Sequence, residues 1–251
     1  VTPRGAGSNL AAATIPEHGG IVLVLTRMNT VLEVSGAELL AVVQAGATTA
    51  ALSEAAAAHG LLYAPDPGSR TVSTVAGNVA MCAGGLRGLK YGVTRNYVLG
   101  LEVVLPTGEV IRTGGRLWKD VAGYDLTRLL TGSEGTLGII TEVTVGLLPL
   151  PAASGTGVAY FDHLADAGRA VAQIIADGVL PATLELPDNR CTNAVEMSAT
   201  SVAKYVVMRI GMNTSDGFAA PSCARYTMML IGITVSPEVL STRNMICAFV
   251  A

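Results

Sequence analysis

The apolar positions in the N-terminal part of the chain fall into short runs separated by glycines and polar residues. Three runs rich in β-branched and aliphatic residues predict strands: GGIVLVL at 19–25, VLEV at 31–34 and LLAVVQAG at 39–46. The alanine-rich segment TTAALSEAAAAHG follows and predicts a helix, with Gly60 placed to end it.

The middle of the chain alternates loops with regular elements. The stretch from 61 to 91 is rich in Gly, Pro, Ser and Thr, which predicts mostly loop with one short helix near residue 78. Two apolar segments flank Pro106-Thr107-Gly108 and predict a hairpin over 97–115. Asp125 is placed to cap a short helix, and GTLGIITEVTVGLLPLP is a β-rich run. The spacing of apolar residues predicts an amphipathic helix at 164–178 and a strand at 181–186.

Composition narrows the functional class. The 251 residues carry a formal net charge of -3, which argues against a nucleic-acid-binding surface. Half of the residues are hydrophobic, which is typical of packed α/β or α+β layers. No apolar run reaches the roughly 20 residues that span a bilayer. The four cysteines form no CxxC pair and the three histidines are isolated, so we expect no metal site and a protein of the reducing cytoplasm.

Three glycine-rich segments carry the candidate chemistry: PRGAGSN at 3–9, PDPGSRTVSTVAGNVAMCAGG at 65–85 and GSEGTLGIIT at 132–141. Glycine lets backbone N–H groups converge on an anion, and Arg4 adds a positive charge to the first segment. No GxxxxGK[ST] motif is present, and the opening GAGSNL lacks the strand-turn-helix setting of a dinucleotide-binding loop. Three such segments with no catalytic dyad between them favour a cofactor-binding site over a catalytic triad.

Taken in order, these segments resemble the FAD-binding domain of the para-cresol methylhydroxylase (PCMH) and vanillyl-alcohol oxidase type. The resemblance is greatest to the FAD-linked subunit of glycolate oxidase and to D-lactate dehydrogenases. It is carried by PRGAGS, APDPGS, STVAGNVAMCAGGLRGLKYGVTRNYVLGLEVVLPTGEVIRTGG, GYDLTRLLTGSEGTLGIITEVTVGLLP and LPATLELPDNRCTNAVE, and it runs from residue 1 to about Glu196.

The resemblance implies an α+β flavoprotein fold with FAD between two subdomains. The first loop would hold the diphosphate through Pro3, Arg4, Gly5, Ala6, Gly7, Ser8 and Asn9. The second segment would line the flavin and its ribityl arm with Gly68, Ser69, Ser73, Thr74, Gly77, Asn78, Ala83, Gly84 and Gly85. The third would close the adenine or ribityl side with Gly135, Ile139, Ile140 and Thr141. The first loop has no histidine, so the FAD is expected to be non-covalent.

Two of these residues have competing interpretations, and so does Glu134. Arg4 could cover a surface instead of a ligand, and Asn78 could cap the short helix instead of contacting the flavin. Glu134 fits a solvated charge better than a general base.

The chain also departs from the resembled family. Ala76-Gly77 stands where paired glycines are frequent, Cys82 where Asn is frequent, and Asn96 where an acid is common. The family's leading β-α-β subdomain is not seen before PRGAGS. Its histidine-containing HxGDGN-like motif is not found either, and residues 197–251 contain no histidine. The last 61 residues hold 6 of the 8 methionines but only 3 of the 29 glycines, which indicates a boundary near Glu196.

We therefore expect three segments: an N-terminally incomplete FAD-binding PCMH-type domain at 1–150, the start of a C-terminal oxidase cap at 151–196, and a divergent tail at 197–251. The implied function is oxidation of a small 2-hydroxy acid, glycolate or D-lactate, to the 2-oxo acid by hydride transfer to flavin. The alternatives are a truncated or frame-shifted, catalytically incomplete fragment and a non-catalytic FAD-binding partner. Catalytic residues are not assigned. Other oxidase subunits are expected partners, and through them the protein could lie at the membrane periphery.

Overall fold

The computed structural model describes residues 1–161, 163–186, 204–212 and 247–250. The chain divides into two compact units, Val1–Leu150 and Pro151–Ala251, each described by itself below. The predicted boundary near Glu196 lies outside the described residues.

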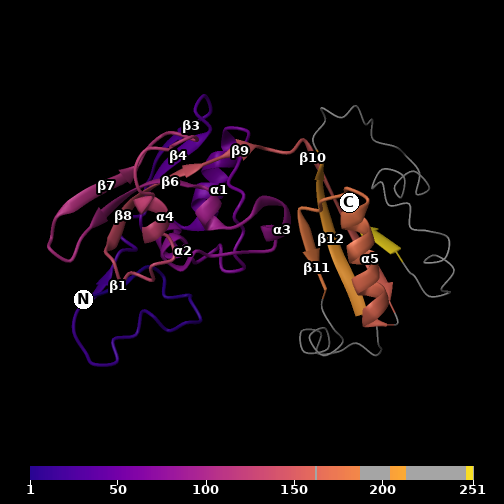
Figure 1. The fold of residues 1–251 in the computed structure, drawn as a ribbon, viewed down its shortest axis with the longest axis horizontal. Coiled ribbons are helices and arrows are strands. Elements are labelled where there is room, and N and C mark those ends of the chain that lie inside the picture. Colours follow the sequence, from indigo (N-terminus) through magenta and orange to yellow (C-terminus); the bar gives the residue numbers. More distant parts are fainter. Residues whose placement is uncertain (162, 187–203, 213–246, 251) are drawn as a thin grey trace. The chain divides into compact units, whose positions relative to one another are not determined.

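The first unit is built on a five-stranded antiparallel sheet with the order β3-β4-β8-β6-β7 (Figure 1). Its strands are β3 (Val31–Ser35), β4 (Leu40–Gln44), β6 (Val98–Val104), β7 (Val110–Gly114) and β8 (Ile139–Gly146). Alternate residues of the central strands point to the core, because successive strand side chains face opposite sides of a sheet. Val43 of β4, Val103 of β6 and Val143 of β8 are all fully buried.

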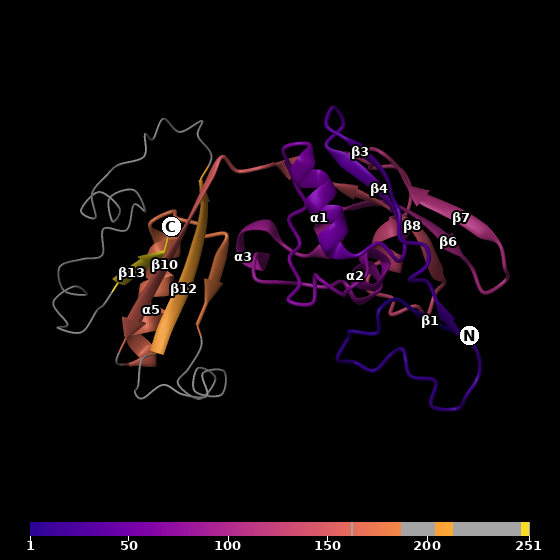
Figure 2. The same cartoon turned by 180° about the vertical axis from the view of Figure 1, so that it is seen from behind.

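Helices α1 (Thr49–Ala58) and α2 (Val75–Met81) pack on the buried face of this sheet, and Figure 2 shows them from behind. Thr48 caps α1 by accepting a hydrogen bond from the Ala51 N–H at 3.1 Å. Leu52 and Ala56, one helical turn apart, are fully buried in the same core cluster as Val43 and Val143. The alanine-rich sequence therefore forms the predicted helix, and Gly60 follows it with a φ of 70°.

Short elements complete this unit. Strands β1 (Thr2–Arg4) and β2 (Val22–Val24) pair in parallel, and β5 (Leu61–Leu62) pairs with β9 (Leu148–Pro149). Helices α3 (Gly88–Tyr91) and α4 (Leu126–Leu130) lie in the connections, with a 3₁₀ turn at Thr94–Asn96. The predicted hairpin is β6 and β7, joined at Gly108 with a φ of 86°. Asp125 caps α4 as expected, because its carboxylate accepts from the Arg128 N–H at 2.8 Å.

The second unit contains an antiparallel sheet with the order β11-β12-β10-β13. Its strands are β10 (Ala153–Phe161), β11 (Thr183–Glu185), β12 (Lys204–Met212) and β13 (Cys247–Val250), and its helix is α5 (Leu164–Ala176). The predicted helix and the strand after it are confirmed. Among the helices of the described residues, none is long and apolar enough to cross a membrane. The two units together give the expected α+β class.

Candidate functional site

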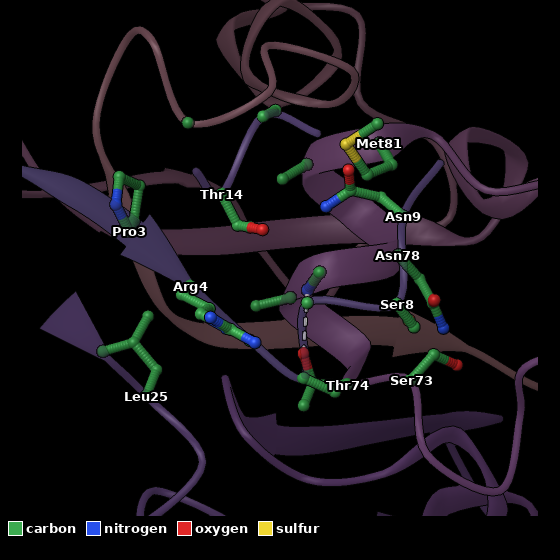
Figure 3. A pocket seen from close by; sticks show the side chains of 18 of the residues that line it. Pro3, Arg4, Ser8, Asn9, Thr14, Leu25, Ser73, Thr74, Asn78 and Met81 are labelled. Carbon is green, nitrogen blue, oxygen red and sulfur yellow. Dashed lines mark hydrogen bonds between the residues drawn. The ribbon is translucent and has the colours of Figure 1, made fainter. Parts of the chain in front are cut away.

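A pocket in the first unit brings the three glycine-rich segments together (Figure 3). Loop 3–9 provides one wall, the start of α2 and the turn before it a second, and the segment before and within β8 a third. The predicted residues that line it are Pro3, Arg4, Gly5, Ala6, Gly7, Ser8, Asn9, Ser69, Ser73, Thr74, Gly77, Asn78, Ala83, Gly135 and Ile140.

The remaining predicted residues do not line this pocket: Gly68, Gly84, Gly85, Ile139 and Thr141. Thr141 is engaged on the sheet instead, where its hydroxyl donates to the Glu102 carboxylate at 2.9 Å. Gly85 lies against the backbone of Asp66 and Pro67, and a Cβ on Gly85 would come within 2.8 Å of the Pro67 nitrogen. A glycine at 85 is therefore explained by close backbone packing.

The first loop leaves a short strand that the sequence pattern did not indicate. Strand β1 pairs with β2, and the Leu25 N–H continues the pairing by donating to the Arg4 carbonyl at 2.9 Å. Three residues are too few to show a strand periodicity. No helix follows the loop, so the setting still differs from that of a dinucleotide-binding loop.

Arg4 folds back over the loop that follows it. Gly7 has a φ of 71°, and a Cβ there would lie 2.7 Å from the Arg4 Nη2 atom. Glycine at this position therefore leaves room for the guanidinium and allows the left-handed backbone. Within the described part of the chain, the Arg4 side chain makes no ion pair and no side-chain hydrogen bond. A guanidinium with five uncommitted donors suits an anionic group such as a diphosphate.

The first loop also carries an unsatisfied acceptor. The Asn9 Oδ1 atom is buried and has no hydrogen-bond partner. A buried polar atom without a partner is costly in a folded protein, and a donor on a bound molecule would satisfy it. Figure 3 shows the Asn9 side chain among those that line the pocket.

Helix α2 presents its first turn to the pocket. Its N-cap is Thr74, whose hydroxyl accepts from the Gly77 N–H at 3.3 Å, as drawn in Figure 3. Of the two alternatives for Asn78, capping of this helix is wrong, because Thr74 is the N-cap and Asn78 lies within the helix. Its amide donates instead to the Thr49 hydroxyl at 2.6 Å, and Thr49 contacts the Ser73 hydroxyl at 3.0 Å. This buried polar chain fixes Asn78 and Ser73 at the pocket wall.

The third segment is joined to the end of the same helix. The Gly132 N–H donates to the Val79 carbonyl and the Glu134 N–H to the Ala80 carbonyl, both at 2.9 Å. Gly135 then approaches the first loop, where a Cβ would lie 2.6 Å from the Pro3 Cγ atom. Helix α2 therefore holds all three segments in one arrangement.

Sequence reasoning missed part of the lining: Ala13, Thr14, Leu25, Ala45, Ala76, Ala80, Met81, Glu134 and Gly138. Helical spacing could have found Met81, which follows Asn78 by three residues on the same helix. Leu25 and Ala45 reach the pocket through strand pairing, which no local motif signals. Among the described residues, no group of three or more His, Cys, Asp or Glu side chains could hold a metal ion.

These features fit FAD. The backbone N–H groups of the loop and the Arg4 guanidinium can donate to a diphosphate. The Asn9 Oδ1 atom, which has no partner, can accept from a hydroxyl or amine group. The pocket lining also includes apolar atoms from Leu25, Met81 and Ile140, which suit a flat ring system.

Comparison with known proteins gives two family matches. Residues 1–114 match the FAD binding domain family, and residues 150–243 match the C-terminal domain of FAD linked oxidases. The chain is 51% identical over 196 residues to the glycolate oxidase subunit GlcD of Bacillus subtilis, covering 78% of this chain and 42% of that protein. It is 41% identical over 227 residues to a D-lactate dehydrogenase of Anaerostipes hadrus, covering 86% of this chain and 48% of that protein.

A solved structure of alkyldihydroxyacetonephosphate synthase shows the same fold. The TM-score is 0.77 with 23% sequence identity, and the match covers 99% of this chain and 49% of that one. The chain thus spans less than half the length of these relatives. Both parts of the family are recognised in order along the sequence, and the cofactor of that family is FAD. The chain belongs to the FAD-linked oxidases, with sequence of their FAD binding domain followed by sequence of their C-terminal domain.

Proposed function

We propose that this chain binds FAD non-covalently in the pocket and serves in the oxidation of a small 2-hydroxy acid to its 2-oxo acid. The single observation that carries the proposal is the pocket of the first unit, where Arg4 and the Asn9 Oδ1 atom have no protein partner among the described residues. The bound flavin would supply the two-electron acceptor.

Different residues of the pocket suit different parts of the cofactor. Loop 3–9 and Arg4 would hold the diphosphate, because backbone N–H groups and a guanidinium both donate to phosphate oxygens. Ser69, Ser73 and Asn78 offer polar groups to the ribityl arm or the ring edge. None of His18, His59 and His163 lines the pocket, so no histidine is placed there for covalent attachment.

The substrate class follows from the relatives. Proteins named glycolate oxidase subunit in Bacillus subtilis and Escherichia coli, and D-lactate dehydrogenases, share 41–51% identity with this chain. Glycolate and D-lactate are both 2-hydroxy acids. Since two of these relatives are named as subunits, further oxidase subunits are proposed partners, and a cytoplasmic location with any membrane contact made through them belongs to the same proposal.

FAD binding is tested by titrating the chain with FAD and following the change in flavin fluorescence. Arg4→Gln should weaken binding by about 10- to 100-fold, since it removes a charge-assisted contact to phosphate. Arg27→Gln is the matched control: Arg27 is exposed, does not line the pocket and should leave the affinity unchanged. Equal affinity in the unaltered chain and Arg4→Gln would contradict the assignment of Arg4.

The reaction is tested by adding glycolate or D-lactate to the FAD-loaded chain without oxygen. Loss of the visible flavin absorbance, with formation of the 2-oxo acid, would support the activity. Bound FAD that no 2-hydroxy acid reduces would contradict the activity of this chain while leaving cofactor binding intact.

A further inference from the structure

A second pocket of the first unit lies apart from the one that the glycine-rich segments form, and the two share no lining residue. Its volume is about 240 Å³, and it is bounded by helix α1, strand β5 and the two loops that carry Arg70 and Arg87. Since one water molecule takes up about 30 Å³ of liquid water, this space is large enough for a molecule of several non-hydrogen atoms. We call it the arginine pocket.

The two arginines of this pocket share one carboxylate partner. The Arg87 Nε atom lies 3.4 Å from one oxygen of Asp66, and the Arg70 Nη1 atom lies 3.6 Å from the other. Charge-assisted hydrogen bonds between a guanidinium and a carboxylate are shorter, about 2.7–2.9 Å. Within the described part of the chain, neither guanidinium makes a hydrogen bond. Both cations therefore keep donors that Asp66 does not satisfy.

Arg87 is the more enclosed of the two arginines. Its side chain is 19% exposed, against 51% for Arg70. A charged group that is largely removed from water needs hydrogen-bond partners to compensate for its lost hydration. Among the described residues, the fully buried side-chain atoms without a partner belong to Asn9 and Tyr63, so the Arg87 nitrogens keep an accessible surface. Because Arg87 lines the arginine pocket, a molecule in the pocket can accept from them.

The rest of the lining is mostly aliphatic. Leu61 and Leu62 of β5 contribute to it, together with Ala57 of α1 and Leu150. Glu54 of α1 is the one acidic side chain among the described lining residues, and it is exposed. Two guanidiniums beside an apolar wall suit a molecule with an anionic end and a short carbon chain. The carboxylate of Glu54 opposes such an anion, so the affinity is expected to be modest.

We propose that the arginine pocket binds the carboxylate of a small organic acid with a short aliphatic chain. The guanidiniums of Arg87 and Arg70 donate to the carboxylate, and the leucines of the wall contact the chain. Inorganic phosphate offers the same acceptor chemistry but has no apolar part, so the wall favours the carboxylate. This site goes beyond the proposed function, because it is separate from the pocket assigned to FAD.

The test titrates the full chain, without FAD, with butyrate and follows binding by saturation-transfer NMR. We expect a dissociation constant on the order of 1 mM. Arg70→Gln should weaken binding about 3- to 10-fold, because it removes a charge-assisted contact. Arg128→Gln is the matched control: Arg128 is also exposed and pairs with an aspartate of its own turn, but it lines neither pocket and should leave binding unchanged.

Two further variants test the charges of the pocket from opposite directions. Arg87→Gln should weaken butyrate binding about tenfold or more. Glu54→Gln should strengthen it about 2- to 5-fold, because it removes the opposing charge. Glu109→Gln, at an exposed position outside both pockets, is the control for Glu54→Gln. If Arg87→Gln does not fold, Arg70→Gln and Glu54→Gln decide: unchanged binding in both would overturn the proposal.

Competing anions and Arg4→Gln settle which anion binds and where. Inorganic phosphate should bind at least about threefold more weakly than butyrate, and sodium chloride at equal ionic strength should displace butyrate only by screening. Phosphate binding as tight as that of butyrate would contradict the carboxylate class. Butyrate binding lost in Arg4→Gln and kept in Arg70→Gln would place the carboxylate beside the glycine-rich segments and overturn the proposal. Because no FAD is added, these results do not depend on whether the chain binds FAD.

Discussion

Gly5 lies directly against the hydroxyl of Thr74, so close that a Cβ on Gly5 would overlap the Thr74 Oγ1 atom. Thr74 is also the N-cap of α2 and accepts from the Gly77 N–H. The first glycine-rich loop therefore rests on the capping side chain of the helix that carries the second segment. The position of the loop and the start of the helix depend on each other.

Gly5→Ala should disturb both elements. The added methyl must displace the Thr74 hydroxyl or the loop, and loss of the cap costs about 1 kcal/mol. We expect a lower melting temperature and at least about tenfold weaker FAD binding, because the diphosphate-binding loop moves away from α2. Thermal unfolding and FAD titration measure the two effects.

Gly36→Ala provides the control for this substitution. Nothing lies within 4 Å of a Cβ placed on Gly36, and its φ is not in the left-handed region. It should leave FAD affinity unchanged. An unaltered affinity in Gly5→Ala as well would show that the contact with Thr74 does not position the loop.

Cys82→Gly should stabilise the first unit. Cys82 ends α2 in the left-handed conformation with a φ of 46°, a position that glycine or asparagine occupies more easily. Relief of this strain, less the greater flexibility of glycine in the unfolded chain, should raise the free energy of unfolding by about 0.5–1 kcal/mol. Urea denaturation measures the change.

Two further substitutions separate strain from side-chain chemistry. Cys82→Ala keeps the Cβ and should give no such gain, whereas Cys82→Asn should give part of it. A gain in Cys82→Ala equal to that in Cys82→Gly would trace the effect to the thiol and contradict the backbone explanation. The resembled family often carries asparagine here, which agrees with this conformation.

Local sequence chemistry predicted the regular elements well. The turn at Gly108, the cap at Asp125 and the alanine-rich helix each depend on residues close together in the chain. The glycine segments and the family resemblance also led to most of the pocket lining. What could not be predicted depends on long-range pairing. The Ala45 N–H donates to the Thr141 carbonyl and the Ala76 N–H to the Ala45 carbonyl, which places Ala45 at the pocket.

Thr49→Val should destabilise the protein, because it leaves the side-chain amide of Asn78 without its acceptor. The Thr49 hydroxyl is the acceptor for the buried Asn78 amide, and valine has nearly the same shape without the oxygen. A buried donor left without a partner costs about 1–3 kcal/mol. Urea denaturation should show this loss in the free energy of unfolding.

Ser53→Ala is the comparison for Thr49→Val. Its hydroxyl donates to the Thr49 carbonyl within the same helix, so its removal leaves no buried donor unpaired. We expect the free energy of unfolding to change by no more than about 0.5 kcal/mol, as for other substitutions that leave no buried polar group without a partner. A loss in Ser53→Ala as large as that in Thr49→Val would indicate that the hydroxyl at 49 has no special role.

The ionisation of Glu102 makes the stability of the sheet depend on pH. Its carboxylate accepts from the Arg112 Nη2 atom at 2.8 Å and from the Thr141 hydroxyl at 2.9 Å, and these bonds hold its pKa below the usual 4.5. Because the pKa is lower in the folded state, the charged carboxylate stabilises the fold above the unfolded value and this contribution is lost as the pH falls through the folded pKa.

The difference in unfolding free energy between the unaltered chain and Glu102→Gln should therefore be largest near neutral pH and should shrink as the pH falls below about 4.5. Denaturant unfolding over a series of pH values measures it. Arg112→Gln removes the first donor and should reduce the same pH dependence. A difference that stays constant across the series would show that the ionised form of Glu102 is not the form that the fold favours.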